Sequence, residues 1–228
     1  MNAIRLNNNQ LKLLAMFFML CDHVGKALLP QWSFLQILGR LAMPIFAYMI
    51  AEGCRHTRSR TRYFLQLFSL ATVCQLVYFF AMGSLYQSIL MTFSLSVLSI
   101  FAIDRFRHNR NLPSGLLLLL TATTVIVLCL GLPRWLSGTD FQIDYGLFGV
   151  LLPVAVYCAP TRNTKLIAAT LATVCLGAVY GGIQWYGLLA IPLLALYDGS
   201  RGKQKLKYLF YIFYPAHLCL IYLIDLLV

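Results

Sequence analysis

Long apolar stretches separated by short polar loops fill almost the whole chain. A bilayer core takes about 20 apolar residues per helix, so stretches of this kind are typical of membrane spans. The pattern predicts nine spans, with ten as the alternative count, at residues 11–29, 34–53, 63–82, 86–103, 115–132, 145–158, 166–180, 185–197 and 208–227. With no linker or repeat between them, we expect an all-α polytopic transmembrane helix bundle that forms one domain over residues 1–228.

Composition supports this interpretation, because 60% of the 228 residues are hydrophobic and only 11% are charged. An ordinary soluble domain contains about 25% charged residues. Residues 1–10 are too polar for the apolar core of a signal peptide, so we expect the first apolar stretch to be a retained helix. The seven cysteines are scattered singly without a CxxC pair, which predicts neither disulfides nor a metal site.

The net charge of +11 would suggest a nucleic-acid partner in a soluble protein. Here topology explains it better, and we expect the lipid bilayer, not nucleic acid, as the partner. Except for Lys26, Arg40 and Arg134, every basic residue lies on one alternating set of loops: Arg5, Lys12, Arg55, Arg58, Arg60, Arg62, Arg105, Arg107, Arg110, Arg162, Lys165, Arg201, Lys203, Lys205 and Lys207. The positive-inside rule then predicts a bacterial inner-membrane protein with a cytoplasmic amino terminus and an extracytoplasmic carboxyl terminus. Tryptophans favour membrane interfaces, and all three, Trp32, Trp135 and Trp185, fall at the loops assigned to the outer face.

Two histidines lie at membrane depth, in the first and last spans. Counted at 1.5 Å per residue from Lys12 and from Lys207, respectively, His23 lies about 16 Å deep and His217 about 15 Å deep, near the middle of the bilayer. A single buried histidine is often only a packing group. Two at one depth favour a shared functional site, in which a neutral imidazole accepts a proton.

Asp22 and Arg40 are charged residues inside predicted spans, where an ionisable group needs a partner or a polar cavity. Their positions on two consecutive antiparallel spans predict that they lie at nearly the same level. A structural Asp22–Arg40 pair and a local pair of Asp22 with Lys26 at i,i+4 spacing are both open. Asp22 points about 100° away from His23 on the helix, so we expect it to act through Arg40 or a water.

The second predicted loop carries alternating arginines that suit either anchoring to anionic lipid or binding of a phosphate. As a phosphate site it predicts contacts to coenzyme A from Glu52, Arg55, Thr57, Arg58, Arg62 and Tyr63. On the outer side, Asp144 is either the cap of the sixth span or part of a substrate mouth. Arg40, Asp144, Tyr145 and Tyr214 are the residues we expect on the substrate side.

These features favour transfer of a group across the membrane, with a proton-coupled transporter as the alternative. In a transporter, His23, His217 and Asp22 would relay protons and Arg40 would bind an anion. Transporters usually show inverted repeats or paired broken helices, and the sequence has neither signal.

Several motifs together resemble the TraX family, which is associated with amino-terminal acetylation of conjugative pilin. They cover most of the chain: Leu11-Lys12-Leu13-Leu14-Ala15, Asp22-His23-Val24-Gly25, Gly39-Arg40-Leu41-Ala42-Met43-Pro44-Ile45-Phe46-Ala47-Tyr48, Ala51-Glu52-Gly53, Thr57-Arg58, Tyr63, Asp144-Tyr145-Gly146, Gly149-Val150-Leu151-Leu152 and Tyr214-Pro215-Ala216-His217-Leu218. The histidines of the first and last spans are also similar to those of the wider superfamily of membrane acyltransferases.

The resemblance implies an acetyl-CoA-dependent acetyltransferase that acts on a pilin amine or a glycan outside the cytoplasm. It implies His23 as the catalytic base. We expect His217 to polarise the thioester carbonyl or to protonate the leaving thiolate, and Asp22 to set the state of the imidazole. Acetyl-CoA enters as a co-substrate, and no metal is expected.

Overall fold

The computed structural model describes residues 5–202 and 206–227. Within these residues the regular structure is helical, apart from two isolated bridges that join Leu6 to Tyr197 and Gln87 to Ile143. The all-α prediction is therefore confirmed. Two of the basic loop residues, Lys203 and Lys205, lie outside the described part of the chain.

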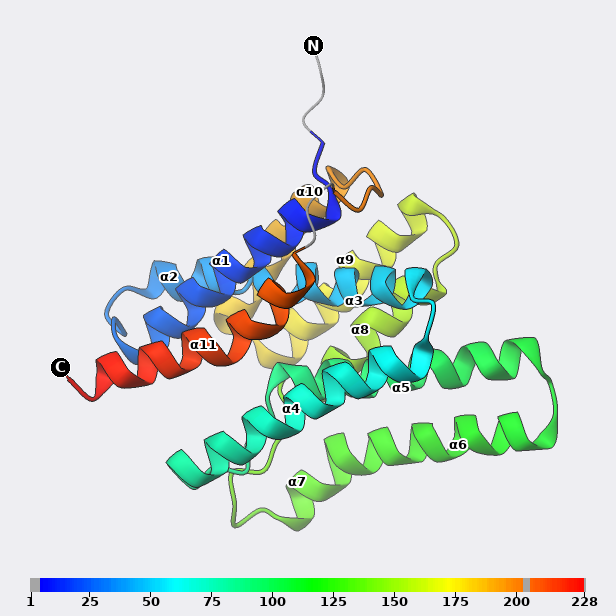
Figure 1. Cartoon of the computed structure of the whole chain (residues 1–228), viewed down its shortest axis with the longest axis horizontal. Coiled ribbons are helices and arrows are strands. Elements are labelled where there is room, and N and C mark those ends of the chain that lie inside the picture. Colours follow the sequence, from blue (N-terminus) through cyan, green and yellow to red (C-terminus); the bar gives the residue numbers. More distant parts are fainter. Residues whose placement is uncertain (1–4, 203–205, 228) are drawn as a thin grey trace. The chain divides into compact units, whose positions relative to one another are not determined.

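The helices follow the nine predicted stretches in order (Figure 1). They are α1 (Asn8–Ala27), α2 (Ser33–Gly39), α3 (Ala42–His56), α4 (Arg60–Met82), α5 (Ile89–His108), α6 (Leu112–Ile126), the π-helical η1 (Val127–Gly131), α7 (Leu132–Trp135), α8 (Gly146–Cys158), α9 (Arg162–Tyr180), the 3₁₀-helical η2 (Gly182–Leu189), α10 (Ala190–Ala195) and α11 (Lys207–Asp225). The second, fifth and eighth predicted stretches are each divided into shorter elements. These interruptions are the main difference from the expected uniform spans.

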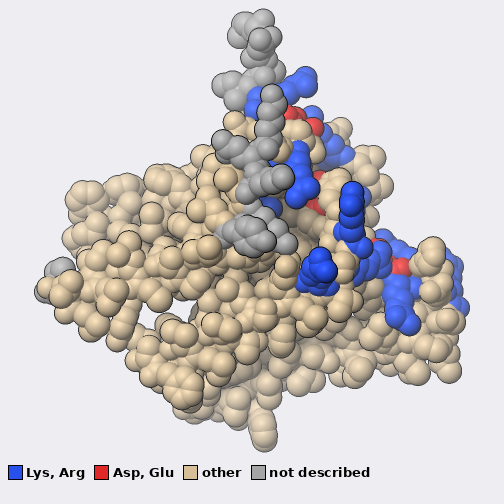
Figure 2. Space-filling view, viewed as in Figure 1, with Lys and Arg blue, Asp and Glu red and all other residues tan. Residues whose placement is uncertain are grey.

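Five helical segments of the described chain are long and apolar enough to cross a membrane: Ser33–His56, Arg60–Met82, Ile89–His108, Leu112–Trp135 and Arg162–Tyr180. Much of the surface visible in Figure 2 carries no charged residue, and large apolar side chains such as Phe80 and Leu119 are exposed. Such a surface is costly in water and suits lipid. The chain is thus a multi-pass membrane protein, while the count of nine spans and their direction remain predictions.

The first of two compact units comprises the described residues up to Met49 and from Arg162 onward. Here α1 lies alongside both α2 and α11 (Figure 1). Asn7 begins α1 with a capping box, because its side chain accepts from the Gln10 amide and the Gln10 side chain accepts in return. Glycines allow α1 and α2 to approach closely, since a Cβ on Gly25 would lie only 2.8 Å from the Leu35 Cβ.

The second unit comprises Ile50–Thr161, so α3 begins in the first unit and ends in the second. Hydroxyl groups on α5 join it to the chain around α8. Ser96 Oγ donates to the Val150 carbonyl at 2.9 Å, and Thr92 Oγ1 donates to the Asp144 carbonyl at 2.6 Å. Such bonds satisfy hydroxyls that would be costly to leave unpaired in an apolar interior. The prediction of one domain over residues 1–228 stays a prediction.

Candidate functional site

The two histidines that are predicted to lie at membrane depth contact each other. His23 Nδ1 on α1 lies 2.8 Å from His217 Nε2 on α11, within hydrogen-bond distance. Their ring centroids are 5.0 Å apart and their planes differ by 22°. With the two nitrogens so much closer than the centroids, the rings meet edge to edge through a hydrogen bond. The structure thus brings together the histidines of the first and last predicted spans, and their shared function stays a prediction.

The hydrogen bonds of His217 determine which ring of this pair donates and which accepts. His217 Nδ1 lies 2.7 Å from the Phe213 carbonyl oxygen, one turn earlier in α11. A carbonyl only accepts, so this nitrogen carries the hydrogen, and in a neutral ring Nε2 of His217 is then the acceptor. His23 must therefore donate through Nδ1, which leaves the lone pair on its Nε2. Among the described residues, none forms a hydrogen bond with that nitrogen.

The surroundings of the two rings differ. His217 is buried at 5% exposure, stacks on the Phe213 ring at 4.5 Å between centroids, and has the Tyr214 ring edge-on at 5.7 Å. His23 is only partly buried. Aromatic packing and two hydrogen bonds thus hold His217 in place, while His23 is the more exposed residue of the pair.

Asp22 forms both of the ion pairs that the sequence left open. One carboxylate oxygen accepts from Arg40 Nη2, and the other lies 2.6 Å from Lys26 Nζ. Asp22 and Arg40 are buried, whereas half of the Lys26 side chain is exposed. Arg40 Nε also donates to the Gln36 carbonyl at 3.3 Å. Pairing of this kind meets the requirement of charged groups at membrane depth.

In the second unit, Arg55 and Arg60 are engaged in holding helices together. Arg55 donates to the Tyr157 and Ala159 carbonyls at 2.5 and 2.6 Å, so it caps the carboxyl end of α8. Arg60 pairs with Asp104 on α5 at 2.8 Å, and the Tyr157 hydroxyl donates to the same carboxylate. These arginines have structural roles that charge patterning alone did not reveal.

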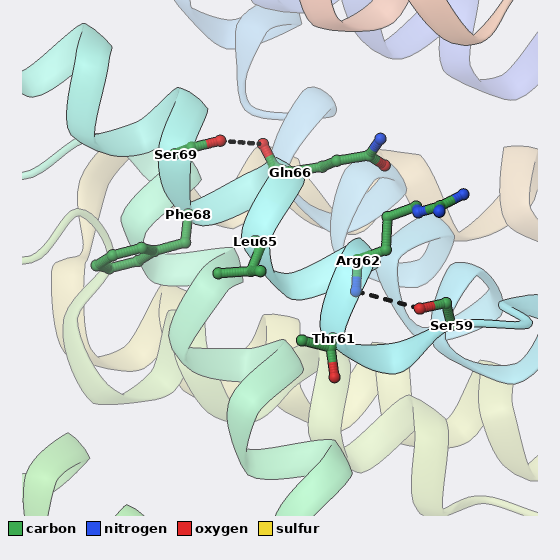
Figure 3. Close-up of a pocket in the computed structure, with 7 residues that line it drawn as sticks. All are labelled: Ser59, Thr61, Arg62, Leu65, Gln66, Phe68 and Ser69. Atoms are coloured by element: carbon green, nitrogen blue, oxygen red, sulfur yellow. Dashed lines mark hydrogen bonds between the residues drawn. The ribbon is translucent and has the colours of Figure 1, made fainter.

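All four arginines of this region are exposed, but within the described residues the guanidinium groups of Arg58 and Arg62 form no hydrogen bond or ion pair. Arg62 lines an open pocket of about 500 Å³ along the first turns of α4, with Ser59, Thr61, Leu65, Gln66, Phe68 and Ser69 (Figure 3). The Arg62 and Gln66 side chains project from successive turns of the helix, and Ser59 caps it by accepting from the Arg62 amide. The pocket combines a guanidinium, hydroxyls and apolar side chains.

The other residues expected to bind coenzyme A lie close by in the chain. Glu52 is buried, with His56 Nε2 3.6 Å from its carboxylate. Thr57 Oγ1 donates to the Ser59 carbonyl at 3.2 Å. The Tyr63 ring packs over Gly53, where a Cβ would lie 3.0 Å from its Cζ atom. Gly53 therefore allows α3 and α4 to come together at the loop that carries the arginines.

Asp144 does not cap α8, which corrects the capping interpretation. The N-cap position belongs to Tyr145, in the left-handed region at φ 57°, and its side chain makes no capping hydrogen bond. Asp144 instead accepts from the Tyr86 hydroxyl at 2.6 Å. Because Gly146 also has a positive φ, the chain needs two consecutive left-handed residues to enter α8, a conformation that sequence pattern did not predict.

Comparison with known proteins bears on this arrangement. The family model described as TraX protein matches residues 7–225, which include all the residues of the candidate site. The chain belongs to the TraX family. This TraX-family chain is also similar to a protein of Dichelobacter nodosus described as "Probable fimbrial assembly protein FimC, serogroup H1", with 26% identity over 239 aligned residues and 93% of each chain covered. No solved structure matches the TraX-family chain.

One polar residue of this TraX-family protein was missed by sequence analysis. Gln184, in η2, is buried at 4% exposure, and its Oε1 atom lies 3.3 Å from Arg40 Nη1. The residue lies among apolar and aromatic neighbours in Gly181-Gly182-Ile183-Gln184-Trp185-Tyr186, beside a predicted outer loop. An uncharged glutamine at this position gives no signal in the sequence. Only its contact with Arg40 in the structure identifies it as part of the site.

Proposed function

We propose that this protein is an integral membrane acetyltransferase. It moves an acetyl group from cytosolic acetyl-CoA to an extracytoplasmic acceptor, either the amino-terminal amine of a pilin or a glycan, in the bacterial inner membrane. Membership of the TraX family and similarity to a protein named for fimbrial assembly support the acceptor class. The observation that carries the proposal is the hydrogen-bonded pair of His23 and His217, which leaves His23 Nε2 available.

The proposed reaction uses His23 first as a base and then as an acid. The acceptor amine attacks the thioester carbonyl carbon and gives a proton to His23 Nε2 as the C–N bond forms. The tetrahedral intermediate then breaks its C–S bond, and the departing thiolate takes the proton from His23. An amine and acetyl-CoA are thereby converted to an amide and free coenzyme A, with the imidazole restored.

His217 is assigned a positioning role in this scheme. Both of its ring nitrogens are occupied, one by the Phe213 carbonyl and the other by His23. It selects the tautomer of His23 and accepts a hydrogen bond from the imidazolium that forms during the reaction. This assignment replaces direct action of His217 on the thioester carbonyl or thiolate.

For the coenzyme A phosphates we propose Arg58 and Arg62. The guanidinium fork binds phosphate well, and these two side chains are exposed, whereas Arg55 is already bonded to two carbonyl oxygens. Thr57, Tyr63 and Glu52 flank the same loop and complete the proposed site. For the acceptor we retain Arg40 and Tyr214 of the first unit as the proposed contacts, while the roles of Asp144 and Tyr145 in the second unit stay predictions from the sequence.

The test is transfer of labelled acetyl from acetyl-CoA to a peptide with a free amino terminus, catalysed by purified protein in nanodiscs. Wild type should transfer the label, and His23→Ala should lose about 100- to 10,000-fold of the rate, as expected for removal of a general base. His108→Ala is the matched control, because His108 lies at the exposed end of α5. Equal rates for wild type and His23→Ala would overturn the proposal.

A proton-coupled transporter is the second candidate, and one observation favours it. Two interrupted helical segments, α2–α3 and η2–α10, contact each other near Arg40 and Gln184. Discontinuous helices commonly form substrate sites in transporters. Proteoliposomes distinguish the two candidates, since a transporter moves protons without acetyl-CoA, whereas the acetyltransferase binds acetyl-CoA and produces free coenzyme A only on acetyl transfer.

A further inference from the structure

The side-chain amide of Gln184 has a fixed orientation. Its Oε1 atom accepts from Arg40 Nη1 at 3.3 Å. A guanidinium has only donors, so the amide oxygen must face Arg40 and the amide nitrogen must point away from it. Exchange of the two amide atoms would set donor against donor.

Gln184 Nε2 is buried and has no hydrogen-bond partner among the described residues. Most buried polar side-chain atoms in folded proteins have a partner, because an unpaired donor loses its hydration without compensation. The donor on Gln184 therefore indicates an acceptor atom that comes from outside the described residues.

The backbone around Gln184 departs from regular α-helix, as is common at polar sites within membranes. Arg40 occupies the cap between α2 and α3, and Gln184 lies in the 3₁₀ segment that precedes α10. Gly187 packs against this break, where a Cβ would lie 3.5 Å from the Arg40 carbonyl oxygen. Non-helical backbone at membrane depth occurs where it is covered by protein or lines a polar cavity.

The charges nearby favour an acceptor with negative charge. Asp22 is shared between Arg40 and Lys26, so this group contains two cations and one anion. His23 follows Asp22 in α1 and is within electrostatic reach of Lys26 and Arg40. An oxygen that carries or develops negative charge is therefore stabilised here.

We propose that Gln184 Nε2 donates to a carboxyl-type oxygen of a bound substrate, in a site completed by the positive charge of Arg40. Two sources supply such an oxygen. One is the acetyl carbonyl, which becomes an oxyanion in the tetrahedral intermediate, and this source rests on the proposed function. The other is a carboxylate of the acceptor, which the site binds in the ground state.

The experiment compares wild type with Gln184→Glu and Gln184→Leu. Glutamate keeps an oxygen for Arg40, replaces the amide donor with an acceptor and adds a negative charge, so it opposes the proposed contact while keeping the bond to Arg40. Leucine removes both contacts. Gln36→Leu is the matched control, because Gln36 Nε2 already donates to the Gly25 carbonyl at 3.2 Å. Thermal unfolding in detergent checks that each variant is folded.

Steady-state acetyl transfer separates the two sources. An oxyanion contact predicts that Gln184→Glu lowers kcat by about 100- to 1,000-fold with KM unchanged, because the contact strengthens only in the transition state. A ground-state carboxylate predicts that KM for the acceptor rises roughly 10- to 100-fold while kcat is retained. Either result supports the site when Gln36→Leu behaves as wild type.

A binding measurement tests the Gln184 site independently of the proposed function. Sodium acetate should raise the unfolding temperature of wild type above that in sodium chloride of equal ionic strength, and Gln184→Glu should abolish the difference. Unchanged kinetics in both Gln184 variants, together with no effect of acetate, would mean that Nε2 binds only a structural water and would overturn the site. A wild type that binds acetate through Gln184 but transfers no acetyl would overturn the proposed function instead.

Discussion

Gly39 lies directly against the side chain of Asp22, where α2 ends beside α1. A Cβ at Gly39 would lie 2.6 Å from Asp22 Oδ1 and 2.7 Å from Asp22 Cα, so the glycine is what allows this approach. The contact places Arg40, the next residue, within reach of the Asp22 carboxylate. The close approach at Gly39 therefore allows the buried ion pair of Asp22 and Arg40 to form.

We expect Gly39→Ala to destabilise the protein by roughly 1–3 kcal/mol, because the added methyl group must push the Asp22 backbone away. Unfolding of purified protein by denaturing detergent measures the loss. Gly115→Ala in α6 is the control, since a Cβ there meets only the Phe106 ring at 3.6 Å. Equal stability of the two variants would show that the Gly39 contact is not tight.

Asp22→Asn should be far more damaging than Lys26→Ala. Asparagine leaves the buried Arg40 without its carboxylate. Breaking a buried ion pair in this way typically lowers stability by about 3 kcal/mol or more, and we expect a loss of about that size here. Lys26 is half exposed, and its loss should cost less than about 1 kcal/mol. The same unfolding assay compares them, and similar losses would contradict the dominant role of Arg40.

The arginines of the 55–62 loop should separate into two classes. Arg55→Ala should lower stability by about 1 kcal/mol, since two carbonyls at the end of α8 lose their donor. Arg58→Ala should leave stability unchanged and weaken binding of coenzyme A in a salt-sensitive manner. Calorimetric titration at low and high salt provides the binding data. Tight binding by Arg58→Ala and Arg62→Ala would exclude these residues from the phosphate site.

Asp140 should make stability depend on pH in the acidic range. The Ser84 hydroxyl and the Leu85 amide donate to its carboxylate, and these bonds lower the pKa of Asp140 from its ordinary value. A lowered folded-state pKa means that the stabilisation is present above the unfolded pKa of about 4 and is lost as pH falls through the folded pKa.

We therefore expect the unfolding temperature of wild type to decrease on acidification below about pH 4, and Asp140→Asn to reduce this decrease. Ser84→Ala should have a smaller effect in the same direction, because one of the two donors remains. Thermal unfolding in detergent across this range is the measurement. Superimposable profiles for wild type and Asp140→Asn would show that the carboxylate does not contribute.

The helices were predictable because hydrophobicity repeats on the scale of a membrane span. Each of the nine apolar stretches contains the expected helix, to within a few residues. The 3₁₀ geometry of η2 was not predictable, because a change from α to 3₁₀ geometry depends on tertiary contacts. The break at Arg40 and Leu41 is a turn between α2 and α3, one helical turn before Pro44, a residue type that distorts helices. The left-handed Tyr145 is a similar case, since it lies so close to Gly149 that a Cβ on the glycine would be 2.5 Å from the Tyr145 Cβ, a contact that no sequence pattern indicates.

The candidate site was predictable where ionisable groups lie at membrane depth. His23, His217, Asp22 and Arg40 each require a partner in lipid, and depth along the helices indicated which groups meet. The roles of Arg55 and Gln184 were not predictable. An arginine that caps a distant helix resembles a phosphate ligand in sequence, and an uncharged amide gives no signal until its neighbours are known.

The direction of the hydrogen bond between His23 and His217 is the claim on which the catalytic proposal depends. Histidine-selective ¹⁵N NMR of the protein in nanodiscs measures it directly, because protonated and unprotonated ring nitrogens have distinct chemical shifts. In the neutral pair we predict hydrogen on Nδ1 of both rings and a bare Nε2 on His23. Hydrogen on His23 Nε2, with Nδ1 as the acceptor, would leave no base for the substrate and would contradict the account.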